Sequence, residues 1–208
     1  MANGSFQTRD LVIRRRRETP LQGVTMQAKA GEIASIIGPS QSGKSALLQA
    51  LADGLKYQGS ITLNGRELRD IHPAELALQR SNIAQETNLD FLFTVREAIN
   101  INLRAKQPEK REQRLSSVLK QLNLTGLDNK QCSLLTSCER QRVALARSFI
   151  QMEEATFGGQ ARWLLLDEPF IDVASDRIDT IIEFLKRFTA AGGGVILASK
   201  DRILAERI

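Results

Sequence analysis

The sequence predicts an α/β fold in which short buried strands of a mixed sheet alternate with helices. A glycine-rich loop at residues 38–45 separates the apolar run Ile33–Ile37 from a predicted helix over 46–55. A later apolar run ends in two consecutive carboxylates, Asp167 and Glu168. The alternation indicates parallel strands, whose carboxyl ends meet at one edge of the sheet. The predicted strands are Leu11–Ile13, Ile33–Ile37, Ile61–Leu63, Trp163–Leu166 and Val195–Ala198.

The middle of the chain departs from this alternation and predicts an inserted helical lobe. From about residue 89 to 150, helical patterns follow one another. One of them places four apolar residues at i, i+3, i+4 and i+7, which gives one apolar helix face. These residues are Leu115, Val118, Leu119 and Leu122.

A single domain over residues 1–208 is the predicted organisation, with a core at about 1–88 and 151–208 and the lobe at about 89–150. The Asn64-Gly65 pair predicts a hairpin turn within a small antiparallel β annex. The chain therefore divides into a sheet core, an annex and a helical lobe.

The composition is that of an ordinary globular protein, with 42% hydrophobic and 25% charged residues. No apolar run approaches the length that crosses a bilayer, and the first residues lack an apolar signal core. The net charge of +5 suits anionic ligands or an anionic membrane leaflet, or else a merely solvated face. Cys132 and Cys138 match no disulfide framework or metal site and are expected to be reduced cytosolic thiols. His72, the only histidine, is expected at a surface helix entry rather than as a ligand.

Residues 38–45 form a complete G-x-x-x-x-G-K-S phosphate loop. Its glycines let backbone N–H groups close round phosphates, Lys44 reaches the β/γ oxygens, and the Ser45 hydroxyl binds Mg²⁺. The helix that follows points the positive end of its dipole at the same phosphates. The loop therefore predicts binding of a nucleoside triphosphate with Mg²⁺. The predicted binding residues are Gly38, Pro39, Ser40, Gln41, Ser42, Gly43, Lys44, Ser45 and Ala46.

The two carboxylates after Trp163–Leu166 complete the predicted site. A buried strand delivers its last side chains to the sheet edge where ligands bind in α/β proteins. Asp167 is placed to hold Mg²⁺, and Glu168 is placed to orient or deprotonate an attacking water. An apolar run followed by Asp-Glu is weak evidence for a catalytic site on its own. Together with the phosphate loop, it indicates a nucleotide site.

The segment Leu135–Arg147 resembles the signature of ATP-binding cassette (ABC) ATPases, in which Leu-Ser-Gly-Gly-Gln/Glu opens a helix that carries Gln-Arg and Ala-Arg. Asp167-Glu168-Pro169 resembles the Walker B continuation of that family, and Gln85 resembles its glutamine loop. The resemblance covers nearly the whole chain in order and spacing. Three segments narrow it to bacterial haem importer ATPases and their iron-siderophore relatives: Pro73–Ala77, Phe91–Glu97 and Met152–Arg162.

This resemblance implies a P-loop NTPase core and an ATP hydrolase that drives import of haem or a related iron chelate. It implies a head-to-tail dimer of ATPase subunits that works with permease subunits at the cytoplasmic face of the inner membrane. It further implies that a substrate-binding protein takes part indirectly and that nucleic acid is not a partner. Gln85 would sense Mg²⁺ as a metal and catalytic residue, Arg15 would stack on adenine, and Lys200 would occupy the switch-histidine position. The signature residues that would contact the partner's ATP are Thr136, Ser137, Cys138 and Glu139.

Several positions depart from the family pattern. Ser137 and Cys138 replace the signature glycines, and their Cβ atoms restrict the approach of the helix to phosphate. Lys200 supplies positive charge but, while protonated, accepts no hydrogen bond. Ala174 stands where the family has an aspartate, and the chain ends at Ile208, short of a usual cassette.

These departures keep two other functions open beside a transport ATPase. The first is an ATP-binding, weakly hydrolysing or non-hydrolysing subunit that acts by interaction. The second is a cassette protein acting on nucleic acid or ribosomes, which is disfavoured because paired cassettes and long coiled coils are absent from the sequence. Phe91, Phe93 and Val95 form either a groove for a permease helix or part of the lobe's core.

Overall fold

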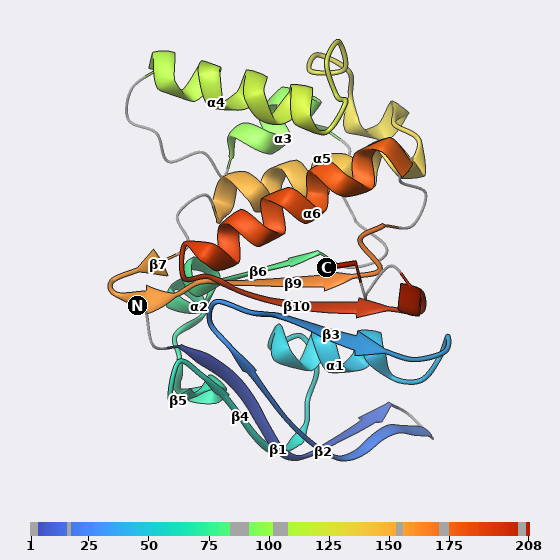
Figure 1. The fold of residues 1–208 in the computed structure, drawn as a ribbon, viewed down its shortest axis with the longest axis vertical. Coiled ribbons are helices and arrows are strands. Elements are labelled where there is room, and N and C mark those ends of the chain that lie inside the picture. The colour runs from blue at the N-terminus through green and yellow to red at the C-terminus, as the bar shows by residue number, and fades with distance from the viewer. Residues whose placement is uncertain are drawn as a thin grey trace.

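The structure is a computed structural model that describes residues 4–15, 18–83, 92–101, 108–152, 156–170, 175–203 and 207–208. Its larger strands form an antiparallel sheet and a parallel sheet, which lie in separate layers (Figure 1). The antiparallel sheet has the strand order β2-β1-β4-β5. Its strands are β1 (Ser5–Arg15), β2 (Glu18–Lys29), β4 (Gln58–Leu63) and β5 (Arg66–Glu67).

The parallel sheet has the order β3-β10-β9-β6. Its strands are β3 (Ile33–Ile37), β6 (Arg80–Ile83), β9 (Trp163–Asp167) and β10 (Gly194–Ser199). Ala198 of β10 lies opposite Asp167 of β9, and Ser199 of β10 lies opposite Ile37 of β3. The carboxyl ends of β3, β10 and β9 are therefore neighbours at one edge.

Helices cover both faces of the parallel sheet (Figure 1). On one face lie α6 (Ser175–Ala190) and α5 (Ser137–Gln151), with α3 (Val95–Asn100) and α4 (Pro108–Gln121) beyond them. On the other face α1 (Lys44–Leu51) lies between the parallel and antiparallel sheets. The remaining short elements are η1 (Leu68–Asp70), α2 (Pro73–Gln79), η2 (Cys132–Leu134) and the hairpin β7 (Thr156–Phe157) and β8 (Gln160–Ala161).

The buried apolar side chains form two cores, one on each face of the parallel sheet. Strand β9 is buried along its whole length and contributes to both. Because successive strand side chains point to opposite faces, Leu164 and Leu166 join the core under the helical layer. Trp163 and Leu165 join the core shared with α1 and the antiparallel sheet. Asp167 continues this second series, so β9 directs its terminal carboxylate toward the α1 face.

The fold class predicted from the sequence is confirmed, and most elements lie where they were expected. The predicted helix over 46–55 is wrong at its end, because α1 stops at Leu51 and Asp53 adopts a left-handed backbone with φ of 55°. The turn at Asn64-Gly65 joins β4 to β5 with φ values of 51° and 81°. His72 caps α2, and its Nδ1 accepts a hydrogen bond from the Ala74 N–H at 3.3 Å.

The helical lobe packs as its apolar pattern predicts. In α4, Leu115 and Leu119 are buried, Leu122 is buried just beyond the helix end, and Val118 packs against the same core. Val95 is fully buried and Phe93 packs on this core, which favours the core alternative for both residues. Phe91 lies outside the described residues.

Both cysteines are free thiols in the structure. Cys132 is buried, and burial raises the pKa of its thiol. Among the residues that the structure describes, no helix is long and apolar enough to cross a bilayer.

Candidate nucleotide site

The phosphate loop leaves the carboxyl end of β3 and leads directly into α1. At its start the Gly38 N–H donates to the Ser199 carbonyl at 3.3 Å, which ties the loop to the end of β10. At its end Gly43 caps α1 with φ of 91° and no side-chain hydrogen bond. The N–H groups of the first helical turn have no acceptor within the helix. An uncapped helix start therefore directs its donors into the loop, as an anion site requires.

Lys44 lies at the centre of this loop, and the residue is only 8% exposed. Its Nζ donates to the carbonyls of Gly38 and Pro39, both at 2.8 Å. The same Nζ lies 3.9 Å from Oε1 of Glu168. A buried ammonium group thus stands between the phosphate loop and the end of β9, where it can meet phosphate oxygens.

Asp167 is buried at the end of β9, next to α1. Burial raises the pKa of its carboxyl group, while a hydrogen bond from Ser45 and the charge of Lys44 lower that pKa to a smaller extent. Its Oδ1 is buried and has no hydrogen-bond partner among the residues that the structure describes. A buried carboxylate oxygen without a partner, beside a hydroxyl group, is the kind of oxygen ligand that Mg²⁺ prefers. Ser45 and Asp167 therefore fit a magnesium ion.

Glu168 follows Asp167 in an unusual backbone conformation, with φ of 48°. Its N–H donates to the Ala198 carbonyl at 2.9 Å, and its own carbonyl accepts from Nε2 of Gln141 at 3.0 Å. The residue is 9% exposed. The turn thus holds the Glu168 carboxylate beside Lys44 rather than along the strand direction.

Lys200 follows the last residue of β10 and is exposed. Because Ala198 lies opposite Asp167 and Ser199 lies opposite Ile37, Lys200 emerges at the edge that carries Gly38 and Glu168. The Ser199 hydroxyl accepts from the N–H of Asp201 at 3.0 Å and so shapes the turn after the strand. The structure therefore brings the predicted switch position to the same edge as the phosphate loop.

The predicted signature residues form the start of α5. The Thr136 hydroxyl accepts from the Glu139 N–H at 3.2 Å, and the Glu139 carboxylate accepts from the Thr136 N–H at 2.8 Å. In this capping box the side chains of Thr136 and Glu139 both form hydrogen bonds within the chain. Lys130 Nζ also lies 3.3 Å from the Glu139 carboxylate. The hydrogen bond from the Thr136 backbone is the main cause that lowers the pKa of Glu139. Ser137 is exposed and Cys138 half-buried beside them.

The start of α5 lies on the same side of the molecule as the carboxyl ends of the parallel strands, but in the helical layer (Figure 1). Gln85 lies outside the described residues, and the side chain of Arg15 does too.

Gln141 is the residue whose role the sequence did not reveal. The signature segment alone leaves Arg140, Gln141 and Arg142 either facing a partner's nucleotide or on the helix surface, whereas the structure buries Gln141 against Glu168. Helical periodicity held a usable signal, since Gln141, Leu145 and Ser148 fall at i, i+4 and i+7 on one buried face.

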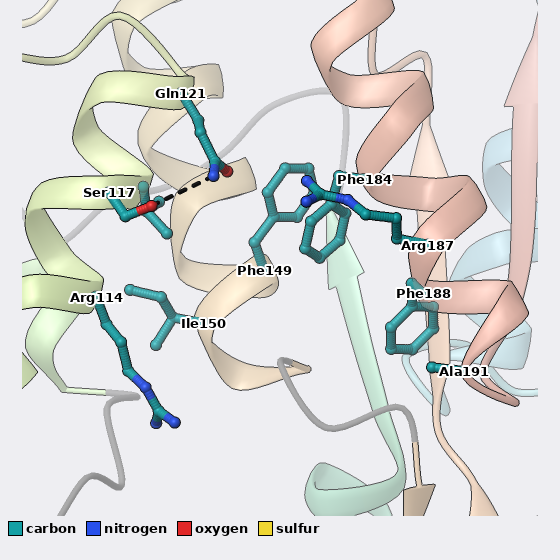
Figure 2. Close-up of a pocket in the computed structure, with 10 residues that line it drawn as sticks. Arg114, Ser117, Gln121, Phe149, Ile150, Phe184, Arg187, Phe188 and Ala191 are labelled. Carbon is teal, nitrogen blue, oxygen red and sulfur yellow. Dashed lines mark hydrogen bonds between the residues drawn. The ribbon is translucent and has the colours of Figure 1, made fainter. Parts of the chain in front are cut away.

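A separate pocket of about 300 Å³ opens between α4, α5 and α6 (Figure 2). Phe149, Phe184 and Phe188 are among its lining residues, and Phe149 stacks on Phe184 with ring centroids 3.5 Å apart. Arg114 and Arg187 stand at its sides. No residue of the phosphate loop lines it, so this pocket is distinct from the nucleotide site.

A phosphate loop, a buried lysine and a strand-end Asp-Glu pair on one edge of a parallel sheet define a P-loop nucleotide-binding protein. The family model described as ABC transporter matches residues 21–171. The chain belongs to the ABC transporter ATP-binding family.

Curated relatives agree with this assignment. The chain is 35% identical over 198 residues to a hemin import ATP-binding protein of Rhizobium leguminosarum, covering 92% of this chain and 75% of the relative. It is 39% identical over 184 residues to the hemin import ATP-binding protein of a Ruegeria strain, covering 87% of this chain and 70% of the relative.

Solved structures show the same fold. An ATP-binding subunit of an ABC transporter superposes with a TM-score of 0.84 at 22% identity, over 97% of this chain and 82% of that chain. The ATP-binding cassette MJ0796, a dimer in a post-hydrolysis state bound to ADP and Pi, superposes with a TM-score of 0.80 at 25% identity. That match covers 96% of this chain and 90% of the cassette.

Proposed function

We propose that the chain is the ATP-hydrolysing subunit of an ABC importer for haem or a related iron chelate. The observation that carries the proposal is the meeting of the phosphate loop and the catalytic carboxylate, with Lys44 Nζ 3.9 Å from Glu168 Oε1. The names of the curated relatives support haem as the cargo.

Each group at this edge has a chemical task in ATP hydrolysis. The open N–H groups of the loop and the first turn of α1 bind the β- and γ-phosphates, and Lys44 exchanges its loop carbonyls for phosphate oxygens. Glu168 orients a water molecule and accepts its proton as the water oxygen attacks the γ-phosphorus. The bond from the γ-phosphorus to the β,γ-bridging oxygen breaks, and ADP leaves.

Mg²⁺ would be held by the Ser45 hydroxyl and the Asp167 carboxylate, with Gln85 as the third residue expected from the sequence. The ion supplies positive charge that neutralises the phosphate oxygens. Asp167 fits this role because its Oδ1 is buried without a hydrogen-bond partner in the described part of the chain.

The dimer that we propose is head to tail, so that the start of α5 in one chain reaches the nucleotide bound by the other. The exposed Thr136 and Ser137 support this arrangement, since an interface segment needs to be accessible. Permease subunits would anchor the dimer at the cytoplasmic face of the membrane, and a substrate-binding protein would deliver the cargo to the permease.

Steady-state release of phosphate from Mg·ATP tests the enzymatic part. We expect hydrolysis by the wild-type chain, and loss of about 10²-fold or more in Glu168→Gln with ATP binding retained. Glu183→Gln, a neutral substitution of an exposed glutamate on α6, serves as the matched control and is expected to keep full activity. Hydrolysis that is absent in the wild type, or unchanged in Glu168→Gln, would refute the proposal and favour a non-hydrolysing interaction subunit.

Reconstitution with the permease in proteoliposomes tests the cargo. We expect a haem-loaded binding protein to stimulate ATP hydrolysis and to deliver haem to the lumen. A ferric siderophore complex with its own binding protein is the comparison, and stimulation by that complex alone would reassign the cargo.

A further inference from the structure

We propose that Gln141 is a positioning residue for Glu168, fixing the backbone from which the catalytic carboxylate projects. This inference rests on the proposed function, because it gives Gln141 a part in hydrolysis. Gln141 lies on α5, and its Nε2 donates to the Glu168 carbonyl at 3.0 Å.

Glu168 needs external support, because its backbone lies in a region that side-chain-bearing residues rarely occupy. Its φ is 48°, where the Cβ atom crowds the backbone. Two hydrogen bonds hold it there, one from its N–H to Ala198 and one from Gln141 to its carbonyl. Ala198 fixes the peptide group before Glu168, and Gln141 fixes the one after it.

The bond from Gln141 to the Glu168 carbonyl is buried. Gln141 is 7% exposed and Glu168 is 9% exposed. Without the amide donor, a buried carbonyl would lose its partner, and the turn would relax toward a conformation with less strain. The carboxylate would then shift relative to Lys44, which now lies 3.9 Å away.

Gln141 also connects two parts of the catalytic machinery. It lies one helical turn after Ser137, within the same helix. A displacement of the start of α5 is therefore transmitted through one side chain to the turn that carries Glu168.

The test replaces the amide without changing its size. Gln141→Leu removes the donor, and Gln141→Glu replaces it with a carboxylate that has no donor when ionised. We expect kcat for ATP hydrolysis to fall about 10²-fold in both variants, with KM for ATP nearly unchanged, since misplacement of a catalytic group has an effect of this size. The matched control is Gln151→Leu on the same helix, whose Nε2 donates to the Ala77 carbonyl at 2.9 Å, away from Glu168.

A spectroscopic signature separates positioning from general loss of structure. In a chain labelled with carbonyl-¹³C glutamate, the Glu168 resonance is the one missing from Glu168→Gln. We expect this resonance to move in Gln141→Leu and to stay in place in Gln151→Leu. A resonance that stays in place in Gln141→Leu, or a wild-type kcat in that variant, would overturn the inference.

The two proposals fail in different ways. A wild-type chain without hydrolysis refutes the proposed function, while the Glu168 resonance still decides whether Gln141 holds the turn. A wild-type chain that hydrolyses ATP, with Gln141→Leu equally active, refutes only the role of Gln141.

Discussion

The N-termini of helices α1 and α5 are capped differently, although both would lie at a nucleotide in the proposed dimer. At α1 the N-cap is Gly43, which offers no side-chain acceptor. At α5 the N-cap is Thr136, which forms a reciprocal capping box with Glu139. One helix start leaves its N–H donors to a ligand, and the other satisfies part of them within the chain.

From this difference we infer that the start of α1 binds the nucleotide, whereas the start of α5 promotes hydrolysis of the nucleotide bound by the partner chain. The start of α1 is enclosed by its own loop, with Lys44 buried at the centre, so it can bind phosphates in a single chain. The start of α5 is exposed and braced by its own capping box, and in the proposed dimer it acts on the nucleotide of the partner chain. Substitutions at the two helices should therefore change different measurements.

The largest effect is expected at α1. Lys44→Ala removes a buried ammonium group, and the loss of its charge-assisted hydrogen bonds to phosphate should weaken ATP binding by about 10²-fold. Titration of the isolated chain with a fluorescent ATP analogue measures this affinity. Lys130→Ala is the matched variant at α5, where Lys130 pairs with Glu139, and it should bind ATP as the wild type does. An equal loss of ATP affinity in the two variants would contradict the assignment of ATP binding to α1.

The next effect concerns the first turn of α5. The double variant Ser137→Gly/Cys138→Gly removes both Cβ atoms and lets the helix approach the partner's phosphate more closely. We expect kcat for hydrolysis to rise about tenfold, part of the 10² to 10³ that one oriented donor contributes. Affinity of the isolated chain for ATP should stay unchanged. A wild-type kcat would show that the serine and cysteine do not limit the reaction.

The capping box itself should affect stability rather than binding. Thr136→Ala removes the acceptor for the Glu139 N–H and should lower the free energy of unfolding by about 1 kcal/mol. For a chain of this size that corresponds to a fall in Tm of about 2–4 °C. Ser133→Ala, which removes an exposed hydroxyl on η2, is the control and should leave Tm unchanged.

A further effect on stability, of similar size, depends on pH and concerns Asp167 beside α1. Burial raises the pKa of Asp167, so its ionised form opposes folding at pH values above that raised pKa. Asp167→Asn should therefore raise Tm of the nucleotide-free chain near pH 7 by a few degrees, about 1 kcal/mol. The gain should shrink as the pH falls and the wild-type carboxyl group takes up its proton.

Thermal unfolding across this pH range measures the difference. The exposed Asp70→Asn variant is the control and should show no such gain. A gain for Asp167→Asn that grows toward acid pH would contradict the sign of the shift.

The placement of the phosphate loop at the start of α1, beside Asp167, could be predicted from the sequence. The spacing of the glycines and the lysine in a phosphate loop predicts the backbone shape of the loop. The apolar run before Asp167 marks a buried strand whose end is fixed by parallel pairing. The rest of the site depends on tertiary contacts that no local pattern encodes. The contact between Gln141 and Glu168 joins residues 27 positions apart, and the left-handed backbone of Glu168 appears only where β9 meets β10.

In the proposed dimer, α1 of one chain and α5 of the other form a single catalytic site, and this can be tested by mixing two inactive variants. Lys44→Ala has a defective phosphate loop and an intact α5, and Ser137→Glu has the reverse, because a carboxylate there repels phosphate. A mixed dimer contains one site with both parts intact. We predict that each variant alone is inactive and that mixing them restores ATP hydrolysis. A mixture as inactive as its components would contradict the account.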